Sequence, residues 1–148
     1  MDDLTSIAAG LQQLAAKAET KKPNTGTENV MIVDDEPMIL EFAMDVLEDY
    51  GYTVKGALNA NEAIQKLVGG FKPAIMCCDI VLPGGMNGVE LARKVMEVMP
   101  DVKILLCSGY GAGMLDGSKN QDGFSMLAKP YQVEELAQRV RNILDGKE

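Results

Sequence analysis

The chain has 148 residues and a formal net charge of −8, so its length suits one small domain with a buried core. The acidic balance argues against nucleic-acid binding, which relies on basic patches. The sequence has no histidine and no CxxC motif, which argues against a zinc site. No apolar stretch approaches the length of a membrane span, and the amino terminus lacks a signal-peptide pattern. We therefore expect a cytoplasmic protein without a membrane partner.

Residues 2–19 form an alanine-rich stretch with an apolar stripe at helical spacing. The stripe consists of Leu4, Ile7, Leu11, Leu14 and Ala18. A helix of this length is only marginally stable alone, so it needs a surface to pack on. A short coiled coil giving a homodimer, a helix docked on its own domain or a neighbour, and a frayed extension all stay open. Residues 20–28 are a polar linker, which predicts two units, 1–28 and 29–148.

From residue 29 onward, short apolar runs alternate with stretches of helical period. The runs cover residues 30–33, 52–56, 74–78, 102–107 and 124–128. Such runs are typical of buried parallel strands, so the pattern predicts an α/β fold with a doubly wound sheet. Three cysteines lie in these runs, namely Cys77, Cys78 and Cys107. We expect them to be reduced and buried rather than paired in disulfides or bound to metal.

Four helices are predicted between and after the strands. The first begins at Pro37. Its expected inward face comprises Met38, Ile39, Phe42, Ala43, Val46, Leu47 and Tyr50. The second and third begin at Asn59 and Asn87, each followed three residues later by glutamate, as in a capping box. The last begins near Gln132. Residues 111–123 hold four glycines among polar residues, which predicts a short or irregular helix there and an altered or mobile surface.

Five polar side chains follow four of the predicted strands. Asp34 and Asp35 follow the first run, and the third, fourth and fifth runs are followed by Asp79, Ser108 and Lys129. Ligands of an open doubly wound sheet bind outside the carboxyl ends of its strands. We therefore expect these five residues to converge on one mouth of the sheet.

The chemistry of this set suits phosphoryl transfer. Clustered carboxylates repel one another, and Mg²⁺ binds through one or two carboxylates plus phosphate oxygens. An aspartate beside a metal is a known nucleophile that gives an acyl phosphate. A lysine and a serine hydroxyl can stabilise charge on the transferred group. The pattern predicts that Asp79 accepts a phosphoryl group, with Mg²⁺ as cofactor and with Ser108 and Lys129 in support.

Residues 29–146 resemble the receiver domain of two-component response regulators. Four motifs carry the resemblance: Asp34-Asp35, residues 79–83 (Asp-Ile-Val-Leu-Pro), Ser108-Gly109 and Lys129-Pro130. Each motif alone is weak, but together and in this order they are specific. The resemblance implies a flavodoxin-like (βα)5 fold with five parallel strands in the order 2-1-3-4-5, to which the chain adds its predicted amino-terminal helix.

The resemblance also implies roles for individual residues. Asp79 would be the phospho-acceptor, and the metal would be held by Asp35, by Asp79 and by the backbone carbonyl of Val81, with Asp34 acting partly through water. The bond before Pro130 would be cis. Such a protein catalyses only its own phosphorylation and slow dephosphorylation.

Four residues are expected to modulate switching or dephosphorylation. Many receivers carry an aromatic residue where this chain has Met126, so Tyr110 or Tyr131 is the alternative partner of the switch. Gly109 keeps the site open to phosphate. Val81 offers no side-chain hydrogen bond to an attacking water and Tyr110 is bulky, so we expect a long-lived acyl phosphate.

The partners follow from the same comparison. Residues 79–110 are most like receivers fused to hybrid histidine kinases. The chain has no histidine, so its phosphate must come from a histidine kinase, a histidine phosphotransfer protein or a small phosphodonor. The expected output is a population shift that alters contact with a downstream protein, or onward relay.

Two other classes of function stay open. A haloacid-dehalogenase-like hydrolase also forms an aspartyl phosphate, but that family needs a second acid two residues after the nucleophile, where this chain has Val81. A phosphorylation-independent interaction module is the third class, and the intact set of five residues argues against it.

Overall fold

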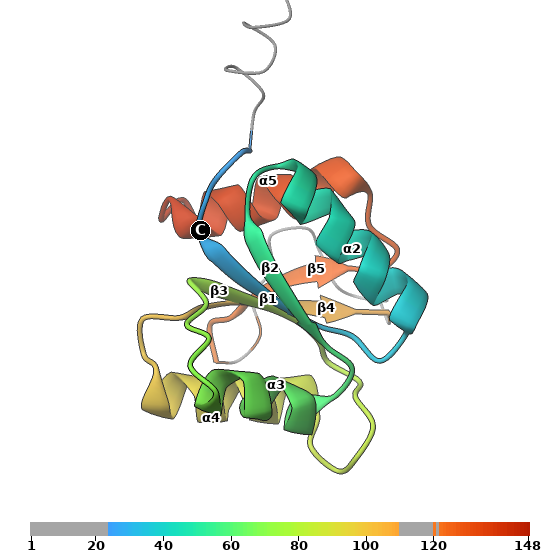
Figure 1. Ribbon diagram of the computed structural model, residues 1–148, viewed down its shortest axis with the longest axis vertical. Coiled ribbons are helices and arrows are strands. Elements are labelled where there is room, and N and C mark those ends of the chain that lie inside the picture. Colours follow the sequence, from blue (N-terminus) through green and yellow to red (C-terminus); the bar gives the residue numbers. More distant parts are fainter. Residues whose placement is uncertain (1–23, 110–119, 121) are drawn as a thin grey trace, which may run out of the picture.

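The computed structural model describes residues 24–109, 120 and 122–148. Five parallel strands form one sheet in the order β2-β1-β3-β4-β5. In chain order they are β1 (Asn29–Val33), β2 (Thr53–Ala57), β3 (Ile75–Asp79), β4 (Lys103–Ser108) and β5 (Ser125–Ala128). Helices α2 (Pro37–Asp49) and α5 (Val133–Leu144) cover one face of the sheet, and α3 (Ala60–Val68) and α4 (Gly88–Val98) cover the other (Figure 1). The predicted doubly wound fold and strand order are confirmed.

The strands β2, β3 and β4 each end one residue beyond the predicted run. Asp79 pairs with Cys107 in the parallel register, and Ser108 pairs with Ala128. Asp79 and Ser108 therefore close β3 and β4 instead of following them. Both side chains are held by the ladder at the carboxyl edge of the sheet, which fixes their position more firmly than a loop would.

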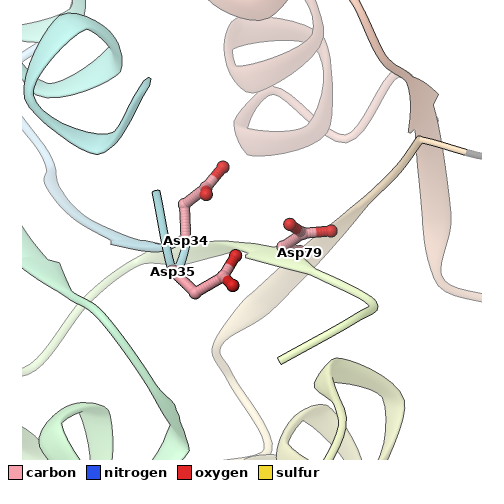
Figure 2. Close-up of side chains that lie close together, drawn as sticks. All are labelled: Asp34, Asp35 and Asp79. Carbon is pink, nitrogen blue, oxygen red and sulfur yellow. The ribbon is translucent and has the colours of Figure 1, made fainter. Parts of the chain in front are cut away.

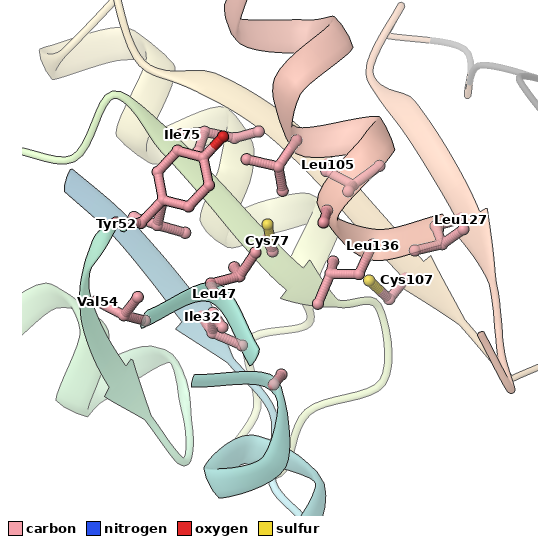
Figure 3. Close-up of a cluster of buried hydrophobic side chains, with 14 of the residues drawn as sticks. Ile32, Leu47, Tyr52, Val54, Ile75, Cys77, Leu105, Cys107, Leu127 and Leu136 are labelled. Carbon is pink, nitrogen blue, oxygen red and sulfur yellow. The ribbon is translucent and has the colours of Figure 1, made fainter. Parts of the chain in front are cut away.

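Side-chain alternation along the strands divides the apolar residues between two cores. The core under α2 and α5 includes Ile32, Cys77, Leu105 and Leu136 (Figure 3). The core under α3 and α4 takes the alternate strand residues, such as Met76. The three cysteines are free and buried, as predicted.

The helix starts agree with the capping patterns. The Asn59 side chain accepts the N–H of Glu62 at 2.8 Å. At α4 the Asn87 side chain accepts the N–H of Glu90, and the Glu90 carboxylate accepts the N–H of Asn87. Pro37 occupies the first turn of α2. These contacts satisfy backbone donors that the first helical turn leaves without partners.

The predicted inward face of α2 is wrong at two residues. The side chains of Met38 and Phe42 are 84% and 51% exposed, and Leu40 is buried instead. The first turn of α2 is apolar on every side, so periodicity alone could not select its buried residues. The structure selects Leu40, which packs over β2.

Gly56 in β2 leaves space for two side chains of α2. A Cβ atom at this position would lie 2.5 Å from Sδ of Met44 and 2.9 Å from Cδ1 of Leu40. Real Cβ atoms do not approach other heavy atoms so closely, so a side chain at Gly56 would require the Met44 and Leu40 side chains to move. The missing side chain therefore lets both residues of α2 pack directly on β2.

Residues 24–28 are attached to the domain by hydrogen bonds. The N–H of Gly26 donates to the Tyr50 carbonyl at 3.1 Å. Arg141 of α5 binds both carboxylate oxygens of Glu28 at 2.8 and 3.0 Å and the carbonyl of Thr25 at 3.1 Å. The last part of the predicted linker therefore packs on the folded domain, and the boundary at residue 28 stays a prediction.

Several predictions concern residues that the structure does not describe. They include the predicted helix at 2–19, Tyr110 and most of 111–123. No helix in the described ranges has the length and apolar character that crossing a membrane requires.

Candidate functional site

Three carboxylates meet at the carboxyl edge of the sheet (Figure 2). Asp34 and Asp35 directly follow β1, and Asp79 is the last residue of the neighbouring β3. One oxygen from each carboxylate lies within 4.8 Å of the others. Asp34 and Asp79 are buried and Asp35 is exposed, so the cluster opens to solvent on the Asp35 side.

The backbone holds the first of these acids in place. The N–H of Asp34 donates to the Ala57 carbonyl of β2 at 3.0 Å. Its Oδ1 accepts the N–H of Glu36 at 2.9 Å, a side-chain to backbone bond that turns the chain into α2. The other oxygen, Oδ2, is left to face the site.

Lys129 reaches the cluster from the residue after β5. Its Nζ lies 2.6 Å from Oδ2 of Asp34 and 3.1 Å from Oδ2 of Asp79. The backbone N–H of Lys129 donates to the Ser108 carbonyl at 2.7 Å, and the bond to Pro130 is cis. The structure therefore brings the five predicted residues to one edge, and it has the predicted cis bond.

The charges of the site do not cancel. Burial raises the pKa of Asp79, because lost hydration outweighs the hydrogen bond and the charge of Lys129. Burial also disfavours the charged form of Lys129, but the hydrogen bonds to Asp34 and Asp79 prevail and raise its pKa to about 12. One ammonium group thus faces three carboxylates. Such a set has room for a hard cation with oxygen ligands.

The residues predicted to modulate the site have different surroundings. The Val81 side chain is exposed. Gly109 is exposed, and a Cβ there would meet no atom within 4 Å. Met126 packs against the core under α3 and α4, whereas Tyr131 packs against the core under α2 and α5. Met126 and Tyr131 therefore lie on opposite faces of the sheet.

Gly88 supports the site and was missed in the sequence. A Cβ at Gly88 would lie 2.1 Å from the carbonyl oxygen of Asp79 and 3.0 Å from Sγ of Cys78. The N–H of Gly88 donates to the Ile80 carbonyl at 2.8 Å. The start of α4 therefore rests directly on the backbone of the acceptor strand. A glycine directly after the capping Asn87 was the available signal.

Comparison with known proteins identifies the family. A sequence model described as the response regulator receiver domain matches residues 30–141. The chain belongs to the response regulator receiver family. The receiver domain is a phospho-accepting module of two-component signalling, which accounts for an acidic cluster beside a lysine at this edge of the fold.

Individual relatives agree with this assignment. The receiver is 30% identical over 135 residues to the sensor kinase CckA of Brucella abortus, covering 89% of this chain and 14% of that protein. It is 30% identical over 118 residues to the chemotaxis protein CheY of Thermotoga maritima, covering 78% of this chain and 97% of CheY. The match to a sensor kinase agrees with the resemblance to kinase-fused receivers.

A solved structure shares the fold. The response regulator TrrA of Thermotoga maritima, in complex with Mg(2+)-BeF, superposes with a TM-score of 0.67 and 29% sequence identity. The superposition covers 79% of this chain and 99% of TrrA. The receiver therefore has the family's architecture over most of its length.

Proposed function

We propose that Asp79 accepts a phosphoryl group from a phosphohistidine donor and that the resulting acyl phosphate switches a protein-binding surface. The observation that carries the proposal is the Lys129 ammonium group, which bridges Asp34 and Asp79 inside a cluster of three carboxylates. This arrangement supplies a nucleophile, an excess of negative charge for a cation and one mobile positive charge for phosphate.

The donor set fits Mg²⁺. Asp34, Asp35 and Asp79 would hold the ion through carboxylate oxygens, joined by the backbone carbonyl of Val81. When bound, Mg²⁺ neutralises the carboxylates and stabilises charge on the phosphoryl oxygens. Support comes from the relative TrrA, whose structure is a complex with Mg(2+)-BeF.

Residues of the receiver perform the other steps. A carboxylate oxygen of Asp79 attacks phosphorus, so an O–P bond forms while the N–P bond to the donor imidazole breaks. The imidazole nitrogen keeps the electron pair and takes a proton from solvent. Lys129 exchanges its bond with Asp79 for one with a phosphoryl oxygen, and the Ser108 hydroxyl donates to another. The buried floor of the site strengthens both contacts.

The receiver is a phosphoacceptor that modifies itself and turns over no other substrate. Val81 stands where a haloacid-dehalogenase-like hydrolase needs its second acid, and its exposed side chain cannot replace a carboxylate. The chain has no histidine, so the donor is a kinase, a phosphotransfer protein or a small phosphodonor. We place this reaction in the cytoplasm.

An apolar hollow beside the site suits a protein donor. It measures about 410 Å³ and is lined partly by Ile39, Phe42, Lys129 and Tyr131. The exposed Met38 lies on the same helix, α2, which carries no basic residue. A donor with an apolar surface bordered by lysine or arginine would match this face.

The decisive experiment measures the covalent adduct on the full chain. Incubation with Mg²⁺ and acetyl phosphate should add one phosphoryl group to the intact mass, and the group should map to Asp79. Asp79→Asn should remove the adduct, and so should omitting Mg²⁺. Asp101→Asn, which changes an exposed acid outside the site, is the matched control and should leave phosphorylation unchanged.

The same experiment separates the three classes of function. A persistent adduct on Asp79 supports the receiver. Continued hydrolysis of many phosphate esters would indicate a hydrolase, and an unmodified wild-type chain would indicate a phosphorylation-independent module. Either of these last two outcomes would overturn the proposal.

The donor surface has a separate test. Phe42→Glu should slow phosphotransfer from a phosphorylated histidine phosphotransfer domain by about tenfold, because a hydrophobic contact is replaced by an unpaired charge. The same variant treated with acetyl phosphate should react at the wild-type rate. Equal losses with both donors would mean that the substitution disturbs the site itself and would remove the docking role.

A further inference from the structure

Asn87 is the only asparagine of the chain that directly precedes a glycine. In such a pair the backbone nitrogen of the glycine can attack the side-chain carbonyl carbon of the asparagine, because no glycine side chain obstructs the approach. A new carbon–nitrogen bond forms, the bond to the side-chain nitrogen breaks, and ammonia leaves with the proton of the glycine N–H. Water then opens the cyclic imide and gives aspartate or isoaspartate. The sequence thus makes Asn87 the residue most prone to spontaneous deamidation.

The fold restrains both reacting groups. The side-chain oxygen of Asn87 accepts the N–H of Glu90 at 2.9 Å, and the backbone N–H of Asn87 donates to the Glu90 carboxylate at 3.1 Å. These two bonds hold the Asn87 side chain over the first turn of α4. The attacking nitrogen belongs to Gly88, and its N–H donates to the Ile80 carbonyl at 2.8 Å. Neither group is free to react while these hydrogen bonds are closed.

Ring closure also requires a rotation that the packing of α4 opposes. The backbone of Asn87 is extended, with φ −84° and ψ 175°, and ψ must change before the Gly88 nitrogen can meet the side-chain carbon. Gly88 is buried, and a Cβ at this position would lie 2.1 Å from the carbonyl oxygen of Asp79. The peptide group that has to turn is therefore packed tightly against the end of β3. The rotation becomes possible only when the first turn of α4 opens.

We propose that Asn87 is a latent deamidation site that becomes reactive when the first turn of α4 opens. Each opening releases the Asn87 amide and the Gly88 N–H together, so the rate of modification follows the free energy of this local opening. In the isoaspartate product the main chain runs through the former side chain and is one carbon atom longer. The longer chain no longer places Gly88 against Asp79, so the start of α4 is displaced from the acceptor strand.

This inference does not depend on phosphorylation, and its test uses the unphosphorylated full chain. The chain is incubated at mildly alkaline pH, and peptide mapping by mass spectrometry follows the conversion of Asn87 from amide to acid. The folded chain should react at least about 10²-fold more slowly than the same chain unfolded in guanidinium chloride. Equal rates would overturn the proposal, because the fold would then give no protection.

Variants of the capping contacts separate local opening from unfolding of the whole domain. Glu90→Ala removes the acceptor of the Asn87 N–H and should speed deamidation about fivefold. Glu90→Gln keeps an acceptor and should react at the wild-type rate. Glu62→Ala is the matched control at α3, where the Glu62 carboxylate accepts the N–H of Leu58 at 2.9 Å, and it should leave the rate unchanged. Equal acceleration by both alanine variants would mean that the whole domain must unfold, and no acceleration by Glu90→Ala would mean that the cap does not protect; either result overturns the proposal.

A comparison of the two products tests the displacement of α4. Asn87→Asp gains the same negative charge but keeps a normal backbone and a side chain that caps helices well, so it should unfold at nearly the wild-type urea concentration. The chain with isoaspartate at position 87, purified after incubation, should unfold at a lower urea concentration. The same midpoint for both would show that α4 accommodates the longer backbone and would overturn the proposed displacement.

Discussion

Two cationic side chains lie at opposite edges of the sheet, and each pairs with two carboxylates. Lys129 at the carboxyl edge contacts Asp34 and Asp79. Arg141 contacts Glu28 and Asp145 beside the start of β1. The groups are similar in charge, but their surroundings differ, and the difference separates a reactive site from a structural one.

Arg141 satisfies its partners more completely. Its guanidinium group donates to both oxygens of Glu28, to Asp145, to the carbonyl of Thr25 and to the hydroxyl of Tyr52. The planar fork of arginine fixes the geometry of each bond. Its hydrogen bond to Glu28 lowers the pKa of that carboxyl, so the pair is fully ionised at neutral pH.

Lys129 is a single ammonium charge among three acids. Burial raises the pKa of Asp79 even though Lys129 lies beside it. The positive charge of Lys129 therefore does not fully offset the cost of burying this carboxylate. The lysine can change partners without breaking a fixed fork of bonds. A site that must exchange a carboxylate for a phosphoryl oxygen benefits from this freedom. The Arg141 cluster, which holds residues 24–28 on the domain, does not need it.

The largest expected effect on phosphorylation comes from replacing Lys129. Lys129→Met should slow phosphorylation by acetyl phosphate about 10²-fold, because a positive charge that stabilises the transition state is lost. The variant also loses the contacts that lower the pKa of Asp79, so that pKa rises and the acid limb of the rate profile moves to higher pH. Intact-mass time courses across pH measure both changes.

Arg141→Met is the matched variant at the other edge. It removes a cation of the same charge but should leave the phosphorylation rate and its pH profile unchanged. A loss of rate as large as that of Lys129→Met would break the comparison, because the two clusters would then share one function.

The next effect concerns the backbone beneath the acceptor. Gly88→Ala should lower the free energy of unfolding by about 2 kcal/mol, because the added methyl group overlaps the carbonyl of Asp79 and overpacking of this kind costs about 1–3 kcal/mol. Urea unfolding measures the loss. Gly109→Ala adds a methyl group into open space and should change stability little. Equal stability of the two variants would show that α4 can move away from β3 at no cost.

A smaller effect is expected at the arginine cluster. Arg141→Lys should lower the free energy of unfolding by about 1 kcal/mol at neutral pH, since the pair is partly solvated and lysine cannot reproduce the fork. The pKa of Glu28 is lowered in the folded state, so this contribution is present above the carboxyl's ordinary value of 4.5 and is lost as the pH falls. The stability difference between wild type and variant should therefore shrink in acid, and a constant difference would remove the ionic explanation.

The smallest effect concerns the lifetime of the phosphorylated state. Val81→Asn should speed the loss of the phosphoryl group by about threefold, because the amide can hydrogen-bond to an attacking water. The measurement is the decay of phosphorylated protein after the donor is removed. Val68→Asn is the control, since it changes another exposed valine away from the acids. An unchanged decay in Val81→Asn would exclude this position from control of the lifetime.

The sequence predicted the strands and the acids well, because both depend on local pattern. Buried parallel strands are continuous apolar runs, and polar side chains at their carboxyl ends share one edge by topology. Asp79 and Ser108 were placed one residue outside their strands, since backbone pairing rather than side-chain type decides where a strand ends.

Features that depend on distant contacts were not predictable. Arg141 and Glu28 are 113 residues apart, and no local pattern connects them. The inward face of α2 was misassigned because Met38 and Leu40 are equally apolar, and only packing over β2 separates them. Gly88 was passed over because the close approach of Asp79 exists only in the folded chain.

The missing side chain at Gly56 affects the helix proposed to contact the donor, α2, and not the residues proposed to accept phosphate. Because the Leu40 and Met44 side chains of α2 rest on that bare stretch of β2, any larger residue there would make them repack, and Met38 and Phe42 belong to the same helix. A substitution at Gly56 would leave the acids at the sheet edge unchanged. Natural variation at this position can therefore alter which donor the receiver recognises without changing the residues that accept the phosphoryl group.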